Sequence, residues 1–156
     1  MAGLSTVLVD TDIFGSLFVR PDRAGQRGHP VTAWRSALEG VRVLISFQTR
    51  AEVLAGVFID SWGKRRVADV RELLDATPTV GVDSDVIEAY ARLRADCRRA
   101  GHPLHAKPHN ADRWHAACAI AKGLPLFARD GIYAGTPGLT LFDTPNIPPP
   151  LTGFQT

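Results

Sequence analysis

The apolar residues of this chain fall into two kinds of segment. Short apolar runs without polar alternation are typical of strands that are buried on both faces of a sheet. They occupy residues 6–9, 41–46, 79–82, 124–128 and 139–142. Longer segments repeat apolar residues at helical spacing, over residues 13–18, 31–38, 47–58, 64–76, 83–100 and 110–122. Strands that alternate with helices predict a three-layer α/β/α domain around a mostly parallel sheet.

Polar, glycine and proline residues predict where these elements end. The segment 20–22 is expected to terminate the first helix, followed by a loop as far as Pro30. Asn110 is expected to cap the helix that follows it. Prolines in the last residues of the chain cannot donate regular ladder hydrogen bonds. We therefore predict a domain over residues 1–144 and a proline-rich tail over residues 145–156.

Length and composition narrow the class of protein. A chain of 156 residues, 45% of them apolar, can bury one substantial core but is short for two domains. Its two cysteines, Cys97 and Cys118, suggest no disulfide framework, and the N-terminus has no signal-peptide pattern. No apolar run is long enough to cross a bilayer. We expect a single-domain protein of the reducing cytoplasm that does not insert into a membrane.

Four acidic residues stand where such a sheet would gather them. Asp10 and Asp130 directly follow buried strands, and the carboxyl ends of parallel strands meet at one edge of a sheet. Glu52 lies within the helix predicted over residues 47–58, and Asp112 lies near the start of an alanine-rich helix. The fold is therefore expected to bring the four carboxylates together.

Each acid also has a structural explanation when it is taken alone. Asp10 could start a turn or cap a helix, although Asp12 is better placed as the cap. Glu52 could complete a capping box, and Asp112 is favoured by the helix dipole. Asp130 precedes a glycine, which is a strong turn signal. The functional interpretation rests on the four together.

Carboxylates forced together repel one another, so a cluster of four implies a cation that neutralises them. Oxygen ligands without histidine or cysteine favour Mg²⁺, with Mn²⁺ able to substitute, over Zn²⁺. The chain has 18 basic and 16 acidic residues, so the 12 acids outside the cluster leave a charge of +6 on the rest of the molecule. Such a charge suits a polyanionic substrate.

Basic residues near Asp112 are candidates for contact with RNA phosphates, namely Lys107, Arg113 and His115. Runs of surface charge are more often simply solvated. Histidines at positions 102, 105, 109 and 115 invite a zinc interpretation, but their spacing matches no regular zinc finger. The role of this histidine cluster is left open.

Four segments, in this order and spacing, carry a resemblance to a known family. They are Val7-Leu8-Val9-Asp10-Thr11-Asp12, Thr49-Arg50-Ala51-Glu52-Val53-Leu54-Ala55-Gly56, Asn110-Ala111-Asp112-Arg113-Trp114-His115-Ala116-Ala117 and Leu124-Pro125-Leu126-Phe127-Ala128-Arg129-Asp130. Over nearly the whole chain the sequence resembles the PIN-domain ribonucleases, and within them the VapC-type toxins of bacterial toxin-antitoxin pairs.

The resemblance implies a sheet of order 3-2-1-4-5, with Asp10, Glu52, Asp112 and Asp130 as catalytic, metal-binding acids. It also implies Mg²⁺-dependent endonucleolytic cleavage of RNA and a cognate antitoxin protein. Because sequence-specific recognition usually reads single-stranded loops, a structured RNA such as tRNA is the expected substrate. We also expect a homodimer, with Trp62 and its apolar neighbours in a dimer or antitoxin groove.

Two features depart from the family pattern. Position 12 commonly carries a small polar residue, whereas Asp12 adds a carboxylate that could be an extra ligand, a partner of a ligand or the helix cap. The segment 101–109 before Asp112 is longer and richer in histidine than expected.

Two other functions compete with the nuclease. In a haloacid-dehalogenase-like phosphatase, Asp10 would attack phosphate and Asp12 would protonate the leaving group. That interpretation leaves Glu52 and Asp112 without roles. A non-catalytic PIN-like module that binds RNA or protein is the other alternative, but an unused cluster of buried acids would be costly.

Overall fold

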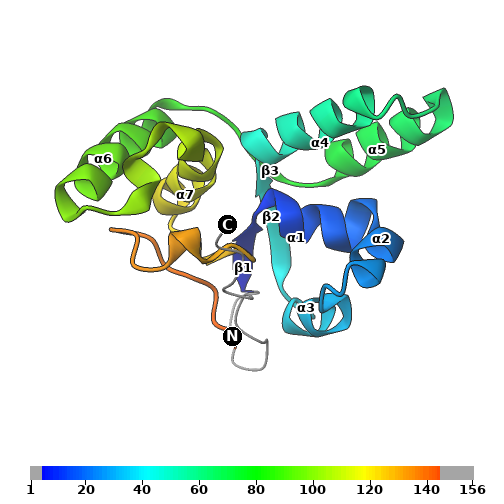
Figure 1. Ribbon diagram of the computed structural model, residues 1–156, viewed down its shortest axis with the longest axis horizontal. Coiled ribbons are helices and arrows are strands. Elements are labelled where there is room, and N and C mark those ends of the chain that lie inside the picture. Colours follow the sequence, from blue (N-terminus) through cyan, green and yellow to red (C-terminus); the bar gives the residue numbers. More distant parts are fainter. Residues whose placement is uncertain (1–4, 145–156) are drawn as a thin grey trace, which may run out of the picture.

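A parallel sheet runs through the middle of the molecule, with helices on both of its faces (Figure 1). The computed structural model describes residues 5–144. Within them the strands are β1 (Thr6–Val9), β2 (Arg42–Ser46), β3 (Thr79–Val80) and β4 (Leu126–Phe127), in the order β3-β2-β1-β4. The pairing of β1 with β2, of β1 with β4 and of β2 with β3 is parallel throughout. The predicted three-layer α/β fold is therefore confirmed.

The helices divide between the two faces of the sheet (Figure 1). On one side lie α1 (Thr11–Phe14), the π-helical turn η1 (Gly15–Val19), α2 (Pro21–Gln26), α3 (Val31–Ala37), α4 (Phe47–Ile59) and α5 (Lys64–Ala76). On the other lie α6 (Ser84–Ala100) and α7 (Asn110–Lys122). Three 3₁₀ turns, η2 (Pro103–His105), η3 (Lys107–His109) and η4 (Gly131–Tyr133), complete the described elements.

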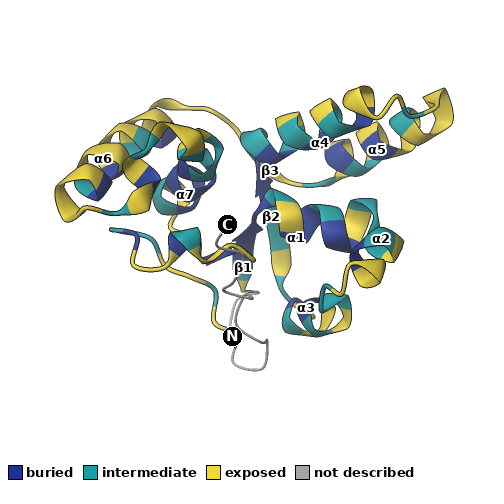
Figure 2. Ribbon diagram, viewed as in Figure 1, coloured by how far each residue is buried: buried dark blue, intermediate teal, exposed yellow. Residues whose placement is uncertain are grey.

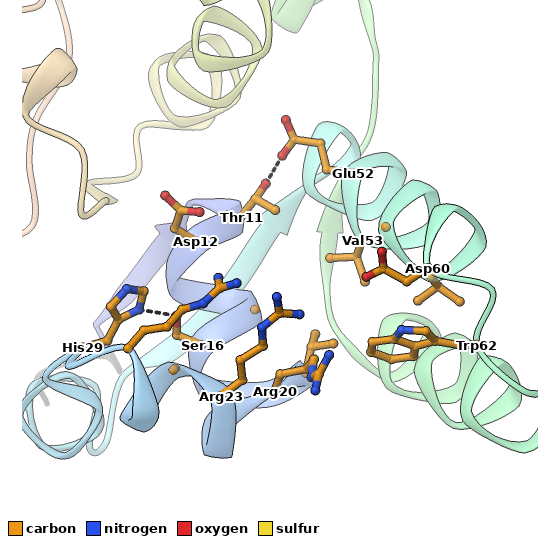
Figure 3. Close-up of a pocket in the computed structure, with 16 residues that line it drawn as sticks. Thr11, Asp12, Ser16, Arg20, Arg23, His29, Glu52, Val53, Asp60 and Trp62 are labelled. Atoms are coloured by element: carbon orange, nitrogen blue, oxygen red, sulfur yellow. Dashed lines mark hydrogen bonds between the residues drawn. The ribbon is translucent and has the colours of Figure 1, made fainter. Parts of the chain in front are cut away.

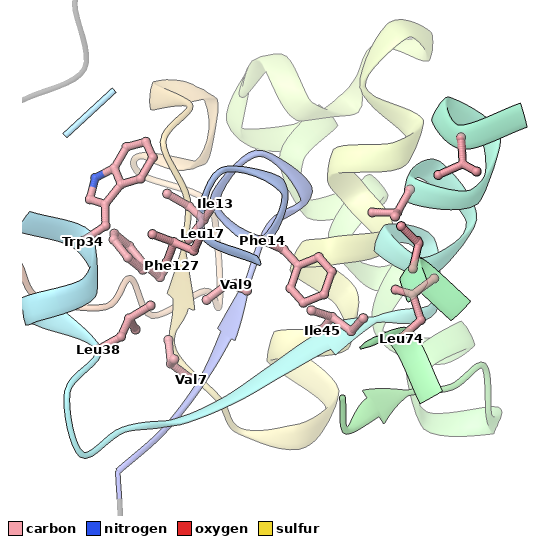
Figure 4. Close-up of a cluster of buried hydrophobic side chains, with 13 residues drawn as sticks. Val7, Val9, Ile13, Phe14, Leu17, Trp34, Leu38, Ile45, Leu74 and Phe127 are labelled. Atoms are coloured by element: carbon pink, nitrogen blue, oxygen red, sulfur yellow. The ribbon is translucent and has the colours of Figure 1, made fainter. Parts of the chain in front are cut away.

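Two hydrophobic cores explain why the strands lack polar alternation. Val7 and Val9 face one core, which contains Phe14, Trp34 and other apolar side chains (Figure 4). Leu8 points to the opposite core beneath α6 and α7. Buried side chains accordingly line the inner faces of the helices, while the outer faces are exposed (Figure 2). Each fully buried aliphatic side chain contributes about 1.5–3 kcal/mol to folding.

The structure corrects the prediction for the segment after η1. Residues 21–26 form the helix α2 instead of a loop. Pro21 occupies the first turn of α2. Backbone N–H groups there have no partner within the helix, so the missing N–H of proline costs nothing, and its fixed φ suits the helix. The preceding helical turn does end at Val19, but the proline starts a second helix where a loop was expected.

The expected cap at Asn110 is also wrong. Asn110 is the first residue of α7, His109 holds the capping position, and no side chain caps this end. The side-chain oxygen of Asn110 instead accepts a hydrogen bond from the Tyr90 hydroxyl at 2.5 Å. The Asn110 side chain is therefore bonded to a residue of α6 and not to the backbone of its own helix.

The fifth strand is reduced to a single parallel bridge between Leu126 and Leu141, beside β4. The sheet order 3-2-1-4 agrees with the expected 3-2-1-4-5 as far as it extends. The predicted tail, residues 145–156, lies outside the described residues, so the domain boundary stays a prediction. Within residues 5–144, no helix is long and apolar enough to span a membrane.

Candidate metal-binding site

Asp10 lies at the carboxyl end of β1 and is only 5% exposed. Its Oδ1 accepts the backbone N–H of Ile13 at 3.0 Å, which makes Asp10 the N-cap of α1. The expectation that Asp12 caps this helix is wrong, because Asp12 already lies inside its first turn. The carboxylate of Asp10 can still accept further bonds while it caps the helix, because each of its two oxygens can accept more than one bond.

The environment of Asp10 disfavours its charged form. The pKa of Asp10 is raised from its ordinary value of 3.8 to about 7, chiefly by burial and to a smaller extent by the negative charges of Asp12 and Asp112. The Ile13 N–H and His115 act in the opposite direction. A cation near Asp10 would reverse this balance, because it stabilises the carboxylate.

Glu52 lies on α4, across from α1, and its carboxylate turns toward Thr11 (Figure 3). The Thr11 hydroxyl donates a hydrogen bond to Oε2, and Gln48 Nε2 donates to Oε1 at 3.3 Å. His115 Nε2 lies 3.5 Å from Oε2. Burial alone would raise the pKa of Glu52, but the bonds from His115, Thr11 and Gln48 outweigh it and lower that pKa.

Asp112 lies in the first turn of α7 and is held by two donors from outside that helix. Tyr133 donates its hydroxyl to Oδ1 at 3.2 Å, and His109 Nδ1 lies 3.1 Å from Oδ2. Burial, followed by the charges of Asp112 and Asp10, raises the pKa of the Tyr133 hydroxyl. Tyr133 is a site residue that the sequence did not reveal, since it carries no motif beyond its place shortly after Asp130.

Asp130 and Asp12 are more exposed than the other acids. Asp130 Oδ1 accepts the backbone N–H of Ile132 at 3.0 Å and starts the turn η4, as its turn signal predicted. Asp12 faces Arg129, whose Nη2 lies 3.8 Å from Oδ2. Both acids have local structural roles, and neither role excludes a ligand.

Electrostatic interactions connect some of these acids to one another or to a neighbouring histidine. Asp10 interacts electrostatically with Asp112 and Asp12, and Glu52 with His115. Among residues 5–144, no three His, Cys, Asp or Glu side chains stand together as a formed metal site. The ligand role of the four acids therefore stays a prediction. The donor chemistry fits a hard divalent cation, because the Asp10 carboxylate is buried and the two acids that act on it, Asp12 and Asp112, also offer carboxylate oxygens.

Two of the three predicted RNA contacts are not at the surface. Arg113 is 2% exposed, and its Nη1 donates to the Leu104 carbonyl at 2.6 Å and to that of Ala106. His115 is also 2% exposed. The expectation that these two side chains meet RNA is corrected, because both are enclosed by protein partners. Lys107 is exposed, so contact between its side chain and RNA stays a prediction.

A groove of about 230 Å³ leads away from the acids (Figure 3). Asp12 and Glu52 line one end, while Arg20, Arg23 and Trp62 line the other. The guanidinium of Arg20 lies 5.5 Å from the centre of the Trp62 ring, within range of a cation–π contact. These arginines were missed because segment 20–30 was interpreted as a loop, although its arginine content is visible in the sequence.

The fold and site together define an α/β protein with a buried acid, Asp10, at the carboxyl edge of a parallel sheet. The model of the PIN domain family matches residues 7–139, and the chain belongs to that family. Nucleases of this family generally use divalent metal ions. Comparison with curated protein sequences gives no significant match.

Several solved structures share this fold. VapBC2 from Rickettsia felis, bound to a promoter DNA fragment, aligns with TM-score 0.66 and 19% identity over 87% of this chain and 96% of that chain. FitAcB from Neisseria gonorrhoeae aligns with TM-score 0.65 and 20% identity, covering 90% and 99%. VapBC-5 of Mycobacterium tuberculosis, described as a toxin-antitoxin system, aligns with TM-score 0.57 and 21% identity, covering 88% and 98%.

Proposed function

We propose that this protein is a Mg²⁺-dependent endoribonuclease and the toxin of a VapBC-type toxin-antitoxin pair. The observation that carries the proposal is the buried carboxylate of Asp10 at the end of β1, with its pKa raised to about 7 beside Asp112 and Asp12. A folded protein retains such a group at a cost in stability, and a bound cation offsets that cost. Membership of the PIN family supports the same chemistry.

In this proposal Asp10, Glu52, Asp112 and Asp130 hold the cation. A divalent cation held by these carboxylates would supply an activated water and shielding for the charge that develops on the scissile phosphate. The protein keeps the Glu52 carboxylate ionised through the Thr11 and His115 contacts. Asp12, paired with Arg129 at 3.8 Å, would adjust the charge beside Asp10.

The proposed partners follow from the exposed Lys107 and from the similar structures. Lys107, which is exposed, would contact the phosphates of a structured RNA such as tRNA. Because the similar structures include toxin-antitoxin complexes, we propose a cognate antitoxin protein, a homodimeric assembly and a cytoplasmic location for this chain.

The phosphatase alternative is less well supported. It requires Asp12 as an acid that protonates the leaving group, but the Asp12 side chain is 57% exposed and faces Arg129. The PIN-domain match over residues 7–139 supports the nuclease, in which we propose Glu52 and Asp112 as ligands, whereas a phosphatase leaves both without a role.

The decisive experiment is cleavage of total RNA by the purified protein, with Mg²⁺ or with excess chelator. We expect cleavage that the chelator abolishes, and that Asp112→Asn abolishes in the presence of Mg²⁺. Asp69→Asn, which changes an exposed aspartate on α5, is the matched control and should cleave normally. Cleavage that persists with chelator, or termini that carry a 2′,3′-cyclic phosphate instead of the products of water attack, would overturn the proposal.

A further inference from the structure

His115 is a buried imidazole on a helix face that otherwise carries small apolar residues. It lies on α7 beside Ala116 and Ala119, each 0% exposed. A histidine at such a position needs partners for both ring nitrogens, because an unpaired buried polar group is costly. Both ring nitrogens of His115 have such partners, and these partners lie on elements other than α7.

The first partner bonds Nδ1. His115 Nδ1 lies 2.7 Å from Ser46 Oγ. Ser46 Oγ also accepts the backbone N–H of Thr49 at 3.2 Å, as the N-cap of α4, and its own hydroxyl proton is free to be donated to Nδ1. Nε2 then carries the ring proton, because it faces Glu52 Oε2, and a carboxylate oxygen can only accept.

The second nitrogen points at the carboxylate of Glu52. His115 Nε2 lies 3.3 Å from Thr11 Oγ1 and 3.5 Å from Glu52 Oε2. The Thr11 hydroxyl donates its one proton to Oε2. Its oxygen therefore acts as an acceptor toward His115 Nε2 and toward Thr49 Oγ1, which lies 3.0 Å away. The donors of Thr11 and His115 are thus directed toward Glu52, and Thr49 and Ser46 in turn bond to these two residues.

The same histidine links the two helices that carry candidate ligands. His115 follows Asp112 by three residues on α7, which places the two side chains on neighbouring positions of one face. Through Ser46 it is bonded to the first turn of α4, the helix that carries Glu52. His115 therefore connects α7 to α4 across the carboxyl edge of the sheet.

We propose that His115 is a positioning residue, which holds the Glu52 carboxylate in place for the cation through the Ser46 and Thr11 hydroxyls. The inference rests on the proposed metal-dependent function. It also replaces the idea that His115 meets RNA. Loss of a group that orients a metal ligand typically weakens metal affinity by about 10–100-fold.

The test measures Mn²⁺ binding to the full chain by the loss of the free-ion electron paramagnetic resonance signal, without RNA. Asparagine and glutamine form a matched pair at position 115. Both amides can be bonded to Ser46, but only the longer glutamine extends a donor to the place of Nε2. We expect His115→Gln to bind Mn²⁺ within about threefold of wild type, and His115→Asn to bind about 10–100-fold more weakly.

A double-mutant cycle separates positioning from a general structural effect. If His115 acts through Glu52, His115→Asn should cause little further loss of Mn²⁺ affinity in a Glu52→Gln background. Equal losses in both backgrounds would overturn the inference. So would Mn²⁺ binding by His115→Asn that matches wild type, together with a loss of RNA affinity in chelator.

The wild-type titration distinguishes the two levels of the argument. If wild type binds no Mn²⁺ and cuts no RNA, the proposed function and the role of His115 are both wrong. If wild type binds Mn²⁺ and both variants at position 115 bind it equally well, only the role of His115 is wrong. Thermal unfolding in chelator verifies that the compared variants are folded.

Discussion

Replacing Asp10 by asparagine should make the metal-free protein more stable at pH 8, although it removes the central candidate ligand. Asparagine has almost the same shape as aspartate and serves equally well as an N-cap, so the bond from the Ile13 N–H to the side-chain oxygen is kept. The main change is the loss of a negative charge from a side chain that is 5% exposed.

The size and sign of the effect follow from the pKa of Asp10. A pKa raised from 3.8 to about 7 corresponds to about 4 kcal/mol, at 1.36 kcal/mol for each pKa unit. Between those two pH values the folded protein retains a proton that the unfolded chain releases, so the free energy of unfolding falls as the pH rises. Asp10→Asn should therefore gain at most about 4 kcal/mol over wild type at pH 8, and almost nothing near pH 4.

Urea unfolding with chelator, at pH 4.5 and at pH 8, measures this difference. Asp69→Asn is the matched control, because it removes one negative charge from an exposed position on α5 that is not among the groups acting on Asp10. Added Mg²⁺ should stabilise wild type but not Asp10→Asn. If the two proteins differ equally at both pH values, the charge of Asp10 is not the cause, and the reasoning that links its burial to a cation is refuted.

Three further predictions concern other residues. Arg113→Met should destabilise the fold by about 3 kcal/mol in denaturant unfolding, because the carbonyls of Leu104 and Ala106 lose their donor; an unchanged midpoint would contradict this. Lys107→Ala should leave the melting temperature unchanged and lower the salt slope of RNA binding by about 0.7, whereas an unaltered slope would remove Lys107 from the RNA surface. Burial raises the pKa of Cys118 to about 12, so iodoacetamide should label its thiol at pH 8 only after unfolding.

The sequence by itself determined the elements and their order. The helix predicted over residues 64–76 is α5 with the same bounds, and the helix predicted to follow Asn110 and end at Lys122 is α7, which differs only by including Asn110. The unalternated apolar run ending at Val9 predicted a strand buried on both faces, and Val7, Leu8 and Val9 are each 0% exposed. Periodicity and burial of this kind are properties of short segments, so a single sequence displays them.

The sequence predicted the position of a candidate ligand in the fold only where one local feature was enough to decide it. Asp10 follows a strand that had to be central, so its place at the sheet edge was expected and is observed. Asp130 follows β4 and also forms its predicted turn. The sequence did not show that Asp10, rather than Asp12, caps α1, because both residues suit the role and the backbone decides between them.

Only the tertiary structure decided which polar side chains are enclosed. Arg113 and His115 stand in a helix beside Asp112 and look like surface residues in the sequence, yet both are 2% exposed. Their partners Ser46, Leu104 and Tyr90 come from other elements, as does the Tyr133 hydroxyl on Asp112. Burial and hydrogen-bond direction depend on which distant segments meet, and local residue order does not encode that meeting.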